Sequence, residues 1–120
     1  MDKKCALCET PLKLGGPLWL GPLHDDQFLT QVHEEVSQNL NLVNPTRVHA
    51  TVQTLIDELK DVAFVYDIEV ISSVLRINTV KLSTVYSALR NKNKRVSLCL
   101  AQPSGIKTEV DYATFVVIFM

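Results

Sequence analysis

Two amphipathic patterns separated by a turn signal occupy the first half of the chain and constrain its fold more than any other feature. From about Asp26 to Leu40, apolar residues recur every three or four positions, which is the spacing of one helical face. Asn44-Pro45-Thr46 then opens a second helix, because proline is tolerated in a first helical turn. We predict two consecutive helices, the first capped by Asp25 or Asp26. The apolar faces comprise Leu29, Val32, Val36 and Leu40, then Val48, Val52, Leu55, Ile56 and Leu59.

The second half begins with an apolar run at residues 62–66, which we predict to be extended. Asp67 follows as the cap of a third helix. Turn formers at residues 76–79 separate this helix from a fourth, Val80 to Asn91. The buried faces would be Val70, Ile71, Val74 and Leu75 in the third helix, and Leu82, Val85, Tyr86 and Leu89 in the fourth.

Alternation from Arg95 to Leu100 is typical of a half-buried strand, and it places Val96, Leu98 and Leu100 on the buried side. Pro103-Ser104-Gly105 forms a turn. The final apolar run, Tyr112 to Met120, fits either a helix or a strand.

With 120 residues and 47% hydrophobic content, the chain can bury one modest core. We predict an α+β fold of about four helices and a small antiparallel sheet, with the CxxC-bearing N-terminal loop folded over it. Residues 1–24 form this Gly/Pro-rich apolar loop, and residues 25–120 form one compact unit. No apolar run reaches the roughly 18 residues of a membrane span, so we expect no membrane partner. The N-terminus lacks an apolar secretory signal, which favours an intracellular location and reduced cysteines.

Charge is divided unevenly along the chain. Residues 1–75 contain five Lys or Arg against eleven Asp or Glu, whereas residues 76–108 contain seven basic residues and no acidic one. Such a segment favours a polyanion, and its placement around a helix and the adjoining strand predicts a winged-helix-like nucleic-acid-binding half. The alternative is a solvated basic face. The seven cations are Arg76, Lys81, Arg90, Lys92, Lys94, Arg95 and Lys107.

Cys5 and Cys8 have the two-residue spacing that lets two thiolates bind one zinc ion, but they form only half of a four-ligand site. A pair of free or redox-active thiols is the alternative. His33 and His49 lie in predicted helices without triad partners, so we assign no catalytic residue. Neighbouring acids such as Asp57-Glu58 are interpreted as solvated outer faces of helices.

Residues 9–24 interleave six glycines and prolines with leucines and the single tryptophan, Trp19. Large apolar side chains are rarely left in water, so we expect this stretch to be an ordered loop that packs on another surface. Ordinary core filling is the alternative role of Trp19.

Three segments resemble the C-terminal region of the tRNA guanine-26 N2-dimethyltransferases: CALC at residues 5–8, GGPLWLGPLHD at residues 15–25 and GIKTE at residues 105–109. Their order and spacing agree with that family over nearly the whole chain. The resemblance implies an enzyme that transfers two methyl groups from S-adenosylmethionine to guanosine 26 of tRNA. It also implies a Rossmann-like catalytic domain N-terminal to this region, and nothing in residues 1–120 matches its cofactor loop or acidic active-site motif.

We therefore expect this chain to be the C-terminal, tRNA-binding part of such an enzyme, inactive alone and without its own S-adenosylmethionine site. The seven cations would hold the tRNA backbone. Docking onto the catalytic domain of the parent chain would use Gly16, Pro17, Leu18, Trp19 and His24, with Trp19 as the anchor. The alternative is a freestanding winged-helix-like module that binds nucleic acid or protein without enzymatic activity.

Overall fold

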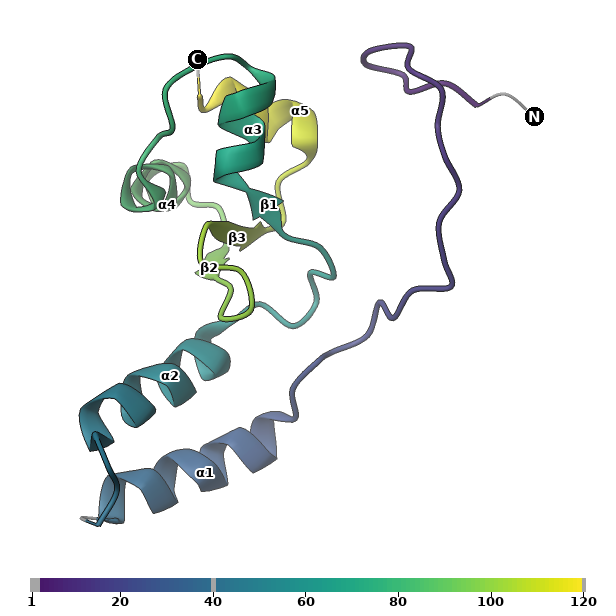
Figure 1. The fold of residues 1–120 in the computed structure, drawn as a ribbon. Helices are drawn as coiled ribbons and strands as arrows, with labels where there is room; N and C mark the ends of the chain where they lie inside the picture. Colours follow the sequence, from purple (N-terminus) through teal and green to yellow (C-terminus); the bar gives the residue numbers. More distant parts are fainter. Residues whose placement is uncertain (1–2, 40, 120) are drawn as a thin grey trace.

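The computed structural model describes residues 3–39 and 41–119, arranged as three parts (Figure 1). An irregular N-terminal segment leads into a pair of helices, and these lead into a small unit of helices and strands. The pair and the N-terminal segment project from this unit, which gives the chain an elongated outline of 56 × 33 × 26 Å.

The two projecting helices, α1 (Asp26–Gln38) and α2 (Pro45–Asp57), lie side by side and confirm the first two predicted helices. Asp25 caps α1, since its carboxylate accepts a hydrogen bond from the Phe28 amide at 2.7 Å. Asn44 caps α2 in the left-handed conformation, with φ of 57°. Leu29 and Val52 are buried between the helices. Leu40, predicted to extend the face of the first helix, lies outside the described residues.

The third part contains a three-stranded antiparallel sheet in the order β1-β3-β2. Its strands are β1 (Tyr66–Asp67), β2 (Val96–Leu98) and β3 (Gly105–Thr108), and Ile106 at the centre faces Tyr66 on one side and Leu98 on the other. The helices are α3 (Ile68–Val74), α4 (Leu82–Asn91) and α5 (Tyr112–Val117). The α+β class is confirmed, with five helices in the described residues and a helix for the last run.

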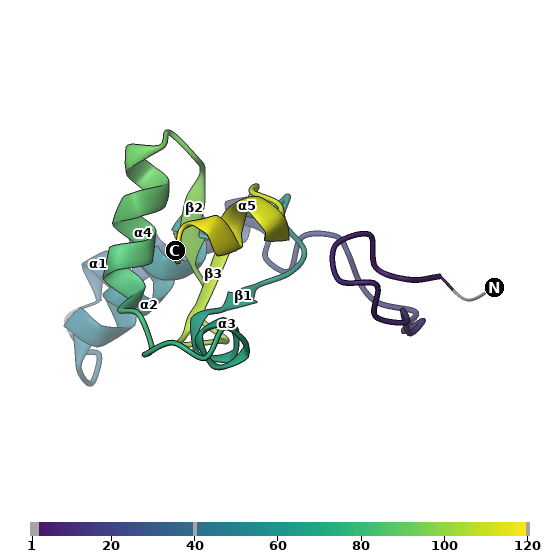
Figure 2. The same ribbon diagram turned by 90° about the horizontal axis from the view of Figure 1, so that it is seen from above.

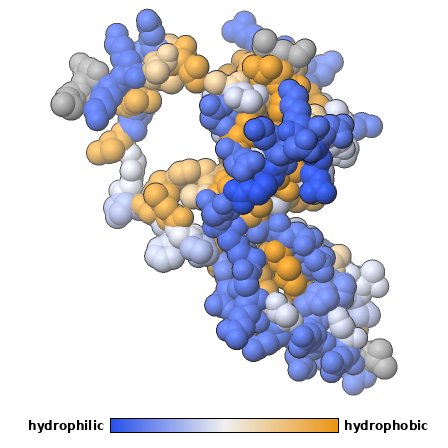
Figure 3. All heavy atoms as spheres, turned by 180° about the vertical axis from the view of Figure 1, so that it is seen from behind, coloured by the Kyte–Doolittle hydropathy of each residue, from blue (hydrophilic) through white to orange (hydrophobic). Residues whose placement is uncertain are grey.

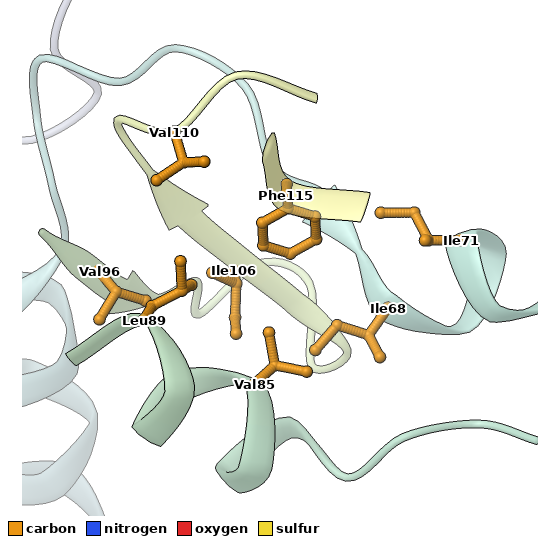
Figure 4. Packing of buried hydrophobic residues seen from close by; sticks show 8 residues of the cluster. All are labelled: Ile68, Ile71, Val85, Leu89, Val96, Ile106, Val110 and Phe115. Carbon is orange, nitrogen blue, oxygen red and sulfur yellow. The ribbon is translucent and has the colours of Figure 1, made fainter. Parts of the chain in front are cut away.

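The hydrophobic core lies within this third part, hereafter the α/β unit. Phe115, Leu89 and Ile106 have no exposed surface. Figure 4 shows these side chains directed toward one another from α5, α4 and β3. Phe115 stacks on Tyr66 with ring centroids 4.3 Å apart. The remaining core residues are Ile68, Ile71, Val85, Val96 and Val110.

The predicted buried face of α3 is partly wrong. Val70 and Val74 are 58% and 65% exposed, and the core side is formed by Ile68, Ile71 and Ser72. The helix follows β1 directly and is fixed by hydrogen bonds from its first amides to Asp67. Its rotation is therefore set by the sheet rather than by its own apolar pattern.

The predicted buried side of the second strand is also wrong beyond Val96. Leu98 and Leu100 are 41% and 42% exposed, whereas Ser97 and Cys99 are buried. The polar side of β2 is covered because the chain following α2 packs against it. The Leu59 amide donates to Ser97 Oγ at 2.9 Å, which satisfies that buried hydroxyl.

The N-terminal loop does not fold over the sheet. Seen from above, it leads away from both the helical pair and the α/β unit (Figure 2). The side chain of Leu14 is fully exposed, and those of Leu12 and Leu18 are 58% and 63% exposed. The expected covering of the core is instead provided by α3, α4 and α5.

Candidate nucleic-acid interface

Three of the seven cations lie at the turn that ends α4: Arg90, Lys92 and Lys94, hereafter the basic turn. The chain reverses at Asn93, whose φ of 55° is left-handed. The Asn93 amide then donates to the Arg90 carbonyl and the Lys94 amide to the Leu89 carbonyl, both at 3.0 Å. This is the hydrogen-bond pattern of a Schellman motif, which closes a helix C-terminus. All three cations are exposed, and none has an ion-pair partner within residues 3–39 and 41–119.

Arg95, the next residue, is held by two carboxylates. Its guanidinium contacts Asp61 Oδ2 at 2.7 Å and Glu109 Oε2 at 2.9 Å. Hydrogen bonds from Arg95 hold the pKa of both carboxyls below their ordinary values. Arg95 is therefore oriented and neutralised by its own chain, unlike the three cations of the basic turn.

Arg76 and Lys81 lie at the other end of α4. Arg76 is in the α3–α4 connection with φ of 54°, and Lys81 is the N-cap residue of α4. The ten residues of α4 separate this pair from the basic turn by roughly 15 Å along the helix axis. The structure therefore divides the surface cations into two groups.

Lys107 is not on the surface. It is 4% exposed, and its Nζ contacts Oε1 of the equally buried Glu58 at 2.7 Å. His24 Nε2 lies 3.6 Å from the other oxygen of Glu58, and the Cys99 thiol donates to Oε1 at 3.8 Å. The geometry does not present Lys107 to a polyanion.

Glu58 was missed by the sequence analysis, which interpreted Asp57-Glu58 as a solvated outer face. Burial opposes ionisation of Glu58, but the hydrogen bond and charge of Lys107 hold its pKa below the ordinary value. The Leu100 amide and His24 act in the same direction. The available signal was the position of Glu58 between Ile56 and Leu59, two residues of the predicted apolar face.

The apolar stretch at residues 15–23, hereafter the apolar strip, is exposed. Trp19 is 71% exposed, which excludes core filling within the described chain. Its indole lies against Gly21, where an added Cβ would come within 2.7 Å of Cζ2, and its Nε1 donates to the Pro22 carbonyl at 3.1 Å. The aromatic ring is thus held in place while facing solvent. Figure 3 shows apolar surface along this N-terminal segment.

Gly16, Pro17, Leu18 and Trp19, the predicted docking residues, all belong to this exposed strip. His24, also a predicted docking residue, lies just after the last residue of the strip and faces Glu58 instead.

Cys5 and Cys8 form a small closed loop. The Glu9 amide donates to the Cys5 carbonyl at 2.9 Å, with Glu9 in the left-handed conformation. The Cys8 thiol lies 3.2 Å from Thr10 Oγ1, and hydrogen bonding to Thr10 lowers its pKa. Among the described residues, no group of three or more His, Cys, Asp or Glu is placed to hold a metal ion. The two thiols do not make a zinc site on their own.

No helix in the described part of the chain has the length and apolar character needed to cross a membrane.

A model of the N2,N2-dimethylguanosine tRNA methyltransferase family matches residues 1–120, the entire chain. The chain belongs to this family. A tRNA (guanine(26)-N(2))-dimethyltransferase of Homo sapiens is 35% identical over 107 residues, covering 88% of this chain and 16% of the relative. The enzyme of the same description from Pyrococcus horikoshii is 32% identical over 101 residues, covering 84% of this chain and 26% of the relative.

A solved structure supports the same assignment for the fold. The complex of Trm1 from Pyrococcus horikoshii with S-adenosyl-L-methionine superposes with a TM-score of 0.75 at 28% identity. The match covers 92% of this chain and 28% of the Trm1 chain. This dimethyltransferase-family chain therefore spans less than a third of the length of each of these relatives.

Two parts of the segments that carry the family resemblance, His24-Asp25 and residues 105–109, make structural contacts in this chain. Asp25 caps α1, and His24 reaches Glu58. In the GIKTE segment, Lys107 pairs with Glu58, Thr108 Oγ1 donates to the Arg95 carbonyl at 2.6 Å, and Glu109 holds the Arg95 side chain.

Proposed function

We propose that this chain is the tRNA-binding part of an S-adenosylmethionine-dependent tRNA guanosine-26 N2-dimethyltransferase, whose catalytic domain lies in the rest of the parent protein. The family membership and the small share of the relatives' length support this role. The main structural support for tRNA binding is the basic turn, where Arg90, Lys92 and Lys94 are exposed without carboxylate partners among the described residues.

We interpret the arrangement around the basic turn as winged-helix-like, on the basis of the order of its elements. Helices α3 and α4 are joined by a turn, and α4 leads directly into the antiparallel β2–β3 hairpin. The major groove of an A-form RNA stem is too narrow for a helix, so α4 would contact phosphates rather than base edges. Lysine and arginine contacts of this kind give affinity without reading sequence.

Arg76 and Lys81 would make a second set of phosphate contacts at the other end of α4, and Arg95 would contribute only if it left Asp61 and Glu109. Lys107 has no such role in this proposal, because its ammonium group is buried.

The apolar strip would dock onto the catalytic domain, with Trp19 as its anchor. An exposed tryptophan held by its own chain loses little conformational freedom on binding, which favours it as an interface anchor. Among the relatives, the Trm1 of Pyrococcus horikoshii was solved with S-adenosyl-L-methionine. In the protein discussed here, the cofactor would bind the catalytic domain, and this chain alone would neither bind it nor transfer methyl groups. A tRNA substrate implies an intracellular location.

The decisive experiment is tRNA binding as a function of salt. We expect Arg90→Gln/Lys92→Gln/Lys94→Gln to weaken binding and to reduce the slope of log affinity against log salt by about 2–3, since each lost phosphate contact removes roughly 0.7–0.9. The matched control is Lys3→Gln/Lys4→Gln/Lys13→Gln, which removes the same charge from exposed positions on the N-terminal segment.

Equal losses in the two triple variants would contradict the proposal, since binding would then follow net charge alone. Tighter binding to duplex DNA than to tRNA would favour the freestanding nucleic-acid-binding module instead. Methyl transfer by the isolated chain would contradict the placement of catalysis elsewhere.

A further inference from the structure

Three separate parts of the chain meet at the carboxylate of Glu58, the C-cap residue of α2. Lys107 reaches it from β3 at 2.7 Å, and His24 reaches it at 3.6 Å from the foot of the apolar strip. Glu58 and Lys107 have side chains that are only 3% and 5% exposed. The helical pair, the apolar strip and the sheet are therefore connected through a single buried ion pair.

Among the residues that the structure describes, the helical pair contributes none to the hydrophobic core cluster of the α/β unit. Every residue of the core cluster, and every partly buried apolar residue packed against it, lies between Tyr66 and Phe119. Between the helical pair and the α/β unit there is instead a recess of about 380 Å³, with Leu55, Val65 and Leu100 in its walls and Glu58 and Lys107 beside them. Apolar side chains therefore do not close the junction between the helical pair and the α/β unit.

The other contacts across the junction are polar. The Leu59 amide donates to Ser97 Oγ, Asp61 pairs with Arg95, and Glu58 itself accepts from the Cys99 thiol at 3.8 Å and from the Leu100 amide. The Asp61 pair is half-exposed, and such pairs constrain geometry weakly because solvent competes for both partners. A buried pair differs, since either charge is strongly destabilised when its partner moves away. Within residues 3–39 and 41–119, Glu58 and Lys107 form the one ion pair across this junction in which both side chains are buried.

We propose that Glu58 and Lys107 are positioning residues: their buried ion pair, braced by His24, fixes the direction in which α1, α2 and the apolar strip leave the α/β unit. The functional consequence rests on the proposed tRNA binding and docking, because the same pair then sets the spacing between the strip and the basic turn. Lys107 acts through this geometry and not by contacting phosphate.

The test measures orientation directly, by residual dipolar couplings of backbone amides in the whole chain. In the native protein, one alignment tensor should fit both the α1–α2 amides and those of the α/β unit. In Lys107→Met, each part should still fit its own tensor, but the two tensors should differ. Lys92→Met is the matched control, and it should keep the single tensor because Lys92 is exposed and unpaired in the described structure.

The apolar double variant Glu58→Leu/Lys107→Met separates orientation from stability. Replacing both partners of a buried pair by apolar residues can restore stability, but it supplies no directional bond. We expect its thermal midpoint to recover toward the native value while the two tensors stay different. This variant also decides the matter if Lys107→Met does not fold. A single native-like tensor in either variant would overturn the proposal, and so would a double variant that fails to fold, since the pair would then be essential to folding itself.

Salt-dependent tRNA binding distinguishes this inference from the proposed function. Lys107→Met should leave the slope of log affinity against log salt unchanged, because no phosphate contact is lost. A slope reduced by about 0.7–0.9 would show a phosphate contact and contradict the positioning role. The triple variant of the basic turn could bind tRNA normally while the dipolar couplings behave as described. That result would contradict tRNA binding by the turn but support the positioning role of Glu58 and Lys107.

Discussion

Lys107→Met should destabilise the chain strongly. It should also reverse the sign of the pH dependence that Glu58 gives to the free energy of unfolding. It leaves Glu58 buried without its partner at 2.7 Å, and breaking a buried pair in this way costs roughly 3–5 kcal/mol. For a chain of 120 residues, an unfolding entropy of about 2.1 cal/mol/K per residue converts this cost into a fall in Tm of roughly 12–20 °C.

The pH dependence follows from the pKa of Glu58. In the native chain, this pKa is depressed despite burial, chiefly because of Lys107. The group therefore contributes stability above its unfolded pKa and loses it as the pH falls through the folded pKa, below the ordinary value of 4.5. Without Lys107, burial is the largest remaining influence and raises the pKa of Glu58, so the variant should gain stability as the pH is lowered toward the ordinary value of 4.5.

Thermal unfolding followed by circular dichroism at several pH values measures both effects. Lys92→Met, an exposed lysine without a partner among the described residues, is the control and should change Tm by less than about 2 °C. A fall in Tm of less than about 4 °C for Lys107→Met would show that Glu58 does not depend on Lys107 for its stability in the folded chain. So would a variant that loses stability on mild acidification.

Three further changes test other parts of the structure. Gly21→Ala should displace the indole of Trp19, because the new Cβ would lie 2.7 Å from Cζ2. Acrylamide quenching of tryptophan fluorescence should then change while Tm does not, and unchanged quenching would contradict the contact. Asn93→Val should cost about 1–3 kcal/mol in chemical denaturation, because its φ of 55° is unfavourable for a β-branched residue, whereas Asn93→Gly should be close to neutral; equal costs would argue against the left-handed turn. Phe115→Ala should cost about 3–5 kcal/mol by loss of a fully buried ring stacked on Tyr66, and a cost below about 1 kcal/mol would show that α5 does not complete the core.

Local signals predicted the parts of the fold that depend on local chemistry. The first two helices follow from apolar spacing, and Asp25, one of the two predicted caps of α1, bonds a nearby amide. The second helix begins at the predicted Asn44-Pro45-Thr46 signal, and the structure adds Asn44 as its cap. Val85 and Leu89 of α4 were predicted as core residues for the same reason, and both are buried.

Tertiary contacts decided the features that the sequence did not predict. The central strand β3 is buried on both faces and has only four residues, so it shows no alternation and was not expected as a strand. The buried side of β2 depends on Leu59 and Glu58, which approach from the end of α2. No local pattern in residues 95–100 could indicate that approach.

The candidate site also combines features that the local sequence predicts with features that depend on tertiary contacts. A count of charges along residues 76–108 correctly located an excess of cations, and the exposed basic turn lies within it. Counting cannot tell which cation meets a carboxylate brought from a distant segment. Lys107 pairs with a residue 49 positions earlier in the chain, and Arg95 with one 34 positions earlier.

Whether the basic turn binds the tRNA backbone can be measured by amide chemical-shift mapping during titration of the isotope-labelled chain with tRNA. We expect the largest perturbations at residues 88–95, smaller ones around Arg76 and Lys81, and little change at Lys107 or along the apolar strip. Perturbations concentrated on the strip, or spread evenly over the molecule, would contradict binding by the basic turn.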